Sequence, residues 1–106
     1  MIAAAHRAAW LTWLASEKRY GSNTLDAYEY DLDDFSNYLS AAENAANAPL
    51  SRQIFRGWLA HMASRHLART TIARRVSSVR SFYRFCGRTK LVDVPDLSWL
   101  RAPQPP

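Results

Sequence analysis

The chain has 106 residues, of which 48% are hydrophobic, thirteen are aromatic and three are glycine. This length corresponds to one domain, and the composition is too apolar for a disordered segment and favours helix. The single cysteine excludes an internal disulfide and a thiolate metal cluster. The lone cysteine fits a reducing, intracellular compartment. No apolar run is long enough to span a membrane, so we expect no membrane association. His6 and Arg7 interrupt the start of the apolar stretch Ala8–Ala15, so we expect no cleaved signal sequence.

Charge is distributed unevenly along the chain. Residues 1–50 contain three basic and seven acidic residues, whereas residues 51–106 contain eleven basic and two acidic residues. The two halves therefore carry charges of −4 and +9, within a net charge of +5. This asymmetry indicates a polyanion-binding face whose affinity falls with salt, although charge alone also fits basic residues that only maintain solubility.

Two long helices are predicted in the first half. The first spans about Ala3–Lys18, and Gly21 is expected to end it. The second is expected to begin with Ser22 as its N-cap and to extend to about Leu39, with apolar residues on one face. The segment Ala41–Pro49 has no periodic stripe and is predicted to be a surface loop.

The second half contains two further long helices and one short one. The third helix is expected to begin after Ser51, a plausible N-cap, and the fourth spans Thr70–Cys86. Pro95 introduces the short helix, which carries Trp99, and the proline-rich end is expected to be extended. Trp99 is either a core residue or an anchor for a neighbouring protomer.

The expected fold class is all-α, a bundle of four long helices plus a short C-terminal helix. Strand-like alternation of useful length does not occur in the sequence. The bundle is expected to pack around Trp10, Trp13 and Trp58.

The fourth predicted helix, capped by Thr70 or Thr71, has two faces of different chemistry. One is an apolar stripe about 120° wide. It consists of Ile72, Val76, Val79, Phe82, Tyr83 and Cys86. The opposite arc contains Arg74, Ser77, Ser81, Arg84 and Arg88, with Arg80 at its edge. Long cations separated by small serines suit a helix that lies against a phosphate backbone, so this arc is predicted to face DNA.

Other polar groups predict no catalytic or metal chemistry. His61 and His66 are five residues apart, which misaligns them on a helix, so no metal site is expected. The acidic group Asp31, Asp33 and Asp34 lacks the spacing of a calcium loop and is interpreted as a solvated face. The tyrosines on the apolar stripes are interpreted as packing residues rather than nucleophiles.

Several of these residues match a known family. The matching pattern consists of Ser22–Leu25, Tyr28, Asp31–Leu32, Phe35, the stretch Thr71–Phe85 and the late Ala102–Pro103. The pattern resembles the N-terminal core-binding domain of tyrosine recombinases, the phage integrase family. Within this family it is most similar to the Xer type, and to XerC more than to its partner. The resemblance extends from Trp10 to Pro103.

The resemblance implies a SAM-like helical domain that forms one arm of a clamp around a recombination half-site. In this family the second and fourth helices face double-stranded DNA, and the first and last join protomers in a tetramer, here with a second Xer-type recombinase. By matching position, the implied DNA contacts are Thr24, Arg74, Arg75, Ser77, Arg80, Ser81 and Arg84, to which the basic arc adds Arg88. Arg75 lies at the edge of the apolar stripe, so an internal ion pair is an equal alternative for it. The second helix is more acidic than is usual in the family, so its start, Ser22–Thr24, is expected to approach phosphate more closely than its middle.

The family's strand exchange uses a tyrosine nucleophile in a second, C-terminal domain and requires no metal or other cofactor. Residues 1–102 are therefore expected to form the DNA-binding domain, and residues 103–106 the start of a linker to that second domain. This fragment is expected not to be an enzyme and to bind no small molecule. The implied role is chromosome dimer resolution on the nucleoid in the bacterial cytoplasm. A phage or integron integrase arm, or a basic helical domain that binds an acidic protein, remain alternatives.

Overall fold

The computed structural model describes residues 4–41 and 51–89. Several predicted features lie outside this range: the short helix after Pro95, Trp99, the loop residues 42–50 and the proposed linker at 103–106. Within it the chain forms four helices, α1 (Ala4–Ser16), α2 (Ser22–Ala41), α3 (Arg52–Ser64) and α4 (Arg69–Arg88). The predicted all-α architecture with four long helices is therefore confirmed.

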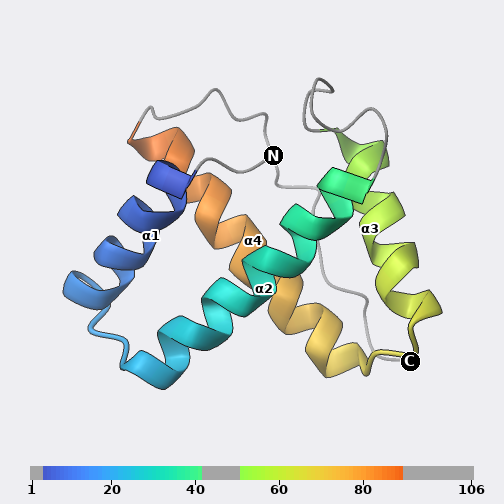
Figure 1. Cartoon of the computed structure of the whole chain (residues 1–106), viewed down its shortest axis with the longest axis horizontal. Coiled ribbons are helices and arrows are strands. Elements are labelled where there is room, and N and C mark those ends of the chain that lie inside the picture. Colours follow the sequence, from blue (N-terminus) through green and yellow to red (C-terminus); the bar gives the residue numbers. More distant parts are fainter. Residues whose placement is uncertain (1–3, 42–50, 90–106) are drawn as a thin grey trace.

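The helix α4 is the central element of the bundle. It packs against α1, α2 and α3, and its most extensive contact is with α2. Figure 1 shows α2 and α4 crossing near their middles, with α1 on one side of the crossing and α3 on the other. Because three helices surround α4, more of its circumference is covered than in a helix packed on one side only.

The junction between α1 and α2 differs from the prediction. The helix α1 ends at Ser16, and the left-handed residue that follows is Arg19, at φ 55°, rather than Gly21. The helix α2 already includes Ser22, because the carbonyl of Gly21 accepts the N–H of Leu25 at 3.0 Å. Gly21 rather than Ser22 is therefore the N-cap residue of α2, so the predicted cap was wrong by one residue.

The other two helix starts give one confirmed cap and one correction. Ser51 caps α3, since its hydroxyl accepts the N–H of Ile54 at 3.2 Å. The N-cap of α4 is Ala68, whose carbonyl accepts the N–H four residues later at 3.0 Å, and no side chain caps this helix. The predicted caps Thr70 and Thr71 were wrong, because both lie within the first turn of α4.

Aromatic side chains fill the core. Trp10 and Trp58 are fully buried, and Trp13 is half-buried against Phe85 with ring centroids 5.3 Å apart. The Trp10 ring meets Phe82 edge to face at 5.4 Å, which joins α1 to α4. The structure thus confirms Trp10 and Trp58 as core residues and places Trp13 at the core margin.

The apolar stripe predicted on α4 is confirmed in full. All six of its residues are buried: Ile72, Val76, Val79, Phe82, Tyr83 and Cys86. Arg75, Ser78 and Phe85 are buried as well, which widens the covered arc to about 180° of the helix. Burial raises the pKa of the Cys86 thiol to about 11, as expected for a packed rather than reactive cysteine.

Candidate nucleic-acid interface

The uncovered side of α4 carries the positive charge that the sequence predicted. This helix contains six arginines and no acidic residue. We call its uncovered arc the basic face, which consists of Arg74, Ser77, Arg80, Ser81, Arg84 and Arg88. Ser77, Arg84 and Arg88 are exposed, Arg74 keeps 53% of its side chain accessible, and Arg80 and Ser81 are half-buried.

Individual members of the basic face differ in their surroundings. Within residues 4–41 and 51–89, Arg84 is paired with no carboxylate. The guanidinium of Arg88 lies 5.3 Å from the Trp13 ring, a cation–π contact that holds it at the end of α1. The hydroxyl of Ser81 accepts the indole N–H of Trp10 at 3.4 Å, so this serine faces partly inward.

Thr24 borders the basic face across a surface groove. The groove runs between the first turns of α2 and the middle of α4, and its lining residues include Asn23, Thr24, Ala27, Arg74 and Ser78. The structure thus brings together Thr24 and Arg74, two predicted contact residues fifty positions apart in the sequence. Thr24 is exposed, so the start of α2 is accessible from the same side as Arg74.

Arg74 forms a two-pronged ion pair at this groove. Its Nε and Nη2 donate to Asp31 Oδ2 and Oδ1 at 3.1 and 2.8 Å. The Asp31 carboxylate is only 1% exposed, and it also accepts a hydrogen bond from the Ser78 hydroxyl at 2.8 Å. The hydrogen bond to Asp31 raises the pKa of Arg74, against a smaller effect of burial, so the guanidinium stays charged.

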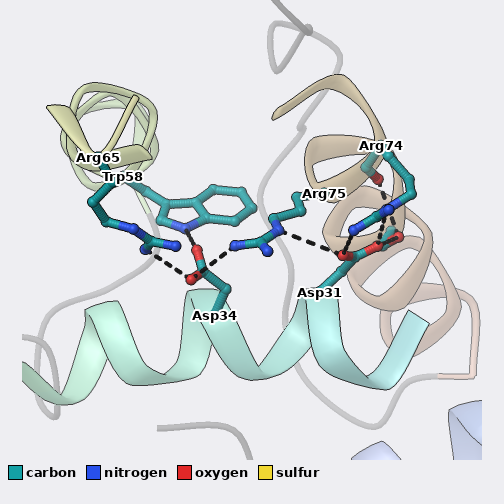
Figure 2. A network of polar contacts seen from close by, with 7 residues as sticks. Asp31, Asp34, Trp58, Arg65, Arg74 and Arg75 are labelled. Carbon is teal, nitrogen blue, oxygen red and sulfur yellow. Dashed lines mark hydrogen bonds and ion pairs between the residues drawn. The ribbon is translucent and has the colours of Figure 1, made fainter. Parts of the chain in front are cut away.

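Arg75 lies in the interior rather than on the basic face. Its side chain is 7% exposed, and its Nη1 lies 3.0 Å from Asp34 Oδ1 while its Nε lies 3.6 Å from Asp31 Oδ1. Neither contact has hydrogen-bond geometry. Figure 2 shows the guanidinium between the two carboxylates of α2. The internal ion pair is therefore the correct alternative for Arg75, which is removed from the candidate DNA contacts.

Asp34 connects three helices. It accepts hydrogen bonds from the indole of Trp58 at 2.9 Å and from Arg65 Nη1 at 2.8 Å, as Figure 2 shows. Burial alone would raise the pKa of Asp34, but the hydrogen bonds from Trp58 and Arg65 and the charges of Arg75 and Arg65 outweigh it and lower the pKa. Asp34 is therefore held as a carboxylate.

The interpretation of the acidic group as a solvated face was wrong for two of its three members. Asp31 and Asp34 belong to the buried network, whereas Asp33 is 45% exposed and pairs with Arg7 of α1. A signal for Asp31 was present in the sequence, because on a helical wheel it falls about 40° from Phe35, on the side of the apolar stripe of α2. No comparable signal exists for Asp34, which falls about 100° from Phe35 on the helical wheel.

The carboxylates of α2 that lie outside the buried network are on the side of the helix opposite Thr24, which we call the outward side of α2. It carries Asp26, Glu29 and Asp33. Tyr30 is 63% exposed, but its ring lies 5.3 Å from the guanidinium of Arg75 on α4. The two longest helices therefore give the domain one basic and one acidic side.

Among the residues that the structure describes, His, Cys, Asp and Glu form no group of three or more that could hold a metal ion. None of the four helices is long and apolar enough to cross a membrane.

The sequence of this chain is similar to a known protein family. The family model for the phage integrase N-terminal SAM-like domain matches residues 8–90. The tyrosine recombinase XerC of Pelotomaculum thermopropionicum is 36% identical over 100 residues, which cover 90% of this chain and 33% of that protein. XerC of Pediococcus pentosaceus is 38% identical over 76% of this chain and 27% of its own length. XerD of Bradyrhizobium diazoefficiens is 42% identical over 72% of this chain and 24% of its own length.

The match is confined to part of each relative. The chain spans about a third of the length of the first of these recombinases and about a quarter of the other two. No solved structure matches the chain.

Proposed function

Because this chain belongs to the phage integrase N-terminal SAM-like domain family, with tyrosine recombinases among its relatives, we propose that it is the DNA-binding module of a site-specific tyrosine recombinase. The observation that carries the proposal is the basic face of α4, where arginines and serines alternate on a helix without acidic residues. This face lies on the side of the domain from which the first turn of α2 is also accessible through Thr24.

The chemistry of this face suits the backbone of a duplex. Ser77 is small, so a phosphate strand approaches the helix closely there, while Arg84 and Arg88 are exposed on the same face of the helix. Guanidinium groups bind phosphate through paired N–H donors, and each phosphate neutralised releases counterions from the DNA. The acidic outward side of α2 repels the same strand, so it favours a single orientation of the domain on DNA.

In the whole protein, this module holds a recombination half-site while another domain carries out strand exchange. The tyrosine nucleophile of the family belongs to that other domain, so residues 1–102 bind and position DNA and residues 103–106 lead toward the catalytic part. We place the module in a tetramer on DNA, with a second Xer-type recombinase, acting in chromosome dimer resolution on the bacterial nucleoid. The similarity to both XerC and XerD relatives supports this role over that of a phage or integron integrase arm.

Fluorescence anisotropy of a labelled short duplex tests the proposal. Affinity is expected to fall steeply as salt rises from about 50 to 200 mM. Substitution of exposed Arg84 by alanine should weaken binding and make the slope of log K against log salt shallower by about 0.9, because one phosphate contact is lost. The melting temperature of Arg84→Ala should be unchanged, since Arg84 makes no ion pair with the described residues.

The contrary results are specific. Binding that is independent of salt would refute the phosphate contacts. A duplex that fails to bind at low salt, while an acidic protein does bind, would favour the protein-interaction alternative.

A further inference from the structure

The ion pair at the groove between α2 and α4 fixes the direction in which Arg74 points. The Asp31 carboxylate of this ion pair is 1% exposed, whereas 53% of the Arg74 side chain is accessible. The carboxylate itself cannot rotate freely, because Ser78 Oγ donates to it at 2.8 Å and Arg75 Nε lies 3.6 Å away on its inner side. Figure 2 shows Arg74 at the end of this network opposite Arg65.

The donors that remain on Arg74 form a defined edge. A guanidinium has five N–H groups, and Asp31 takes one from Nε and one from Nη2. The remaining three are the second N–H of Nη2 and both N–H groups of Nη1. One from each nitrogen together make a parallel fork, which matches two neighbouring acceptors. Because Asp31 already orders the side chain, little conformational entropy is lost when the fork binds.

The charge of the pair favours a neutral acceptor over a phosphate. The Asp31 carboxylate offsets the charge of Arg74 and repels a nearby anion, but it leaves the directional fork intact. The groove residues Asn23, Thr24 and Ala27 are uncharged and supply no second cation. In double-stranded DNA, the neutral acceptor pair that fits such a fork is O6 and N7 of guanine in the major groove.

We propose that Asp31 is a positioning residue that presents the free edge of Arg74 to a guanine in the major groove. The groove between α2 and α4 then reads sequence, while Arg84 and Arg88 on the same helix hold phosphates. This inference rests on the proposed DNA-binding function and adds a source of base discrimination to it.

Selection from a randomised duplex pool, followed by sequencing, tests the assignment on the 106-residue chain. The wild type should enrich a guanine at one position. Arg74→Lys retains the charge but loses the fork, so it should reduce that preference by about 10- to 100-fold while the salt dependence of binding persists. Arg84→Lys is the matched control on the same helix, and any change in affinity that it causes should be equal for all sequences, with the guanine preference kept.

Asp31→Asn tests the positioning role directly. It removes the carboxylate that orders Arg74 and should flatten the guanine preference, whereas a purely structural role would lower affinity for every sequence equally. A melting curve establishes whether this variant is folded, and Arg74→Lys decides the question if it is not. If the pool binds in a salt-dependent manner but shows no guanine preference, or the same preference in Arg74→Lys, the inference is wrong and the proposed function stands. If no duplex binds, the proposed function fails as well.

Discussion

Substitution of Arg75 by methionine separates the fold from DNA binding. Methionine preserves most of the side-chain volume, so the change mainly removes the buried charge between Asp31 and Asp34. The sequence placed Arg75 among the DNA contacts with an internal ion pair as the alternative, whereas the structure buries 93% of its side chain. The variant therefore tests whether Arg75 stabilises the fold or contacts DNA.

The expected loss of stability follows from the partners that remain. Removal of one member of a buried ion pair costs about 3–5 kcal/mol when the other is left alone. Here Asp31 keeps Arg74 and Ser78, and Asp34 keeps Arg65 and Trp58. We therefore expect a smaller cost of about 2 kcal/mol, which lowers the melting temperature of a domain of this size by about 10 °C.

Thermal unfolding followed by circular dichroism measures the first quantity, and anisotropy below the transition measures DNA affinity. Arg75→Met should unfold at the lower temperature yet bind duplex DNA within about twofold of the wild type. Arg84→Met is the matched control, and it should bind duplex DNA more weakly with an unchanged melting temperature. A stable Arg75→Met variant with strongly reduced affinity would refute the internal assignment and restore Arg75 as a DNA contact.

Three further outcomes are expected from the contacts in the bundle. A Cβ on Gly57 would lie 2.2 Å from the Tyr38 hydroxyl oxygen, so Gly57→Ala should destabilise α3 packing in chemical denaturation and Tyr38→Phe should relieve the defect, despite the better helix propensity of alanine. Ser51→Ala should cost about 1 kcal/mol of unfolding free energy in the same assay, because the N–H of Ile54 loses its cap. The pKa of Asp34 is lowered in the folded state. Its contribution to stability is therefore complete above the unfolded-state pKa of about 4 and is lost as the pH falls through the lower folded-state pKa. The difference in unfolding free energy between wild type and Asp34→Asn should accordingly narrow in acid.

Each of these has a contrary result. A Gly57→Ala variant as stable as the double variant would mean that Tyr38 moves aside without cost. An unchanged unfolding free energy for Ser51→Ala would show that water replaces the cap. A constant gap between wild type and Asp34→Asn from pH 7 to acid would separate Asp34 from the acid sensitivity of the fold.

Local periodicity was sufficient to predict the helices and the faces of α4. The six residues of its apolar stripe are all buried, because a helical wheel depends only on spacing along one segment. The helical wheel predicted a buried arc of α4 that was too narrow, because the number of helices that surround α4 depends on the whole bundle. Arg75 and Ser78 were covered for that reason.

Long-range pairing could not be predicted from the same patterns. Asp31 and Arg74 are 43 residues apart, and Asp34 and Arg65 are 31 apart, so nothing local indicates that they meet. The acidic character of α2 suggested a solvated surface, whereas part of it neutralises the inner side of the basic helix. Helix starts were displaced for a different reason, because a backbone carbonyl such as that of Ala68 begins a helix without a polar side chain.

The central claim is that the basic face of α4 and the start of α2 bind duplex DNA. Titration of the isotopically labelled chain with a short duplex, followed by amide chemical shifts in NMR spectra, tests it residue by residue. The largest changes should occur at Thr24, Ser77 and Arg84, while Asp26 and Asp33 on the outward side of α2 stay unchanged. Changes concentrated on that outward side, or none along α4, would contradict the account.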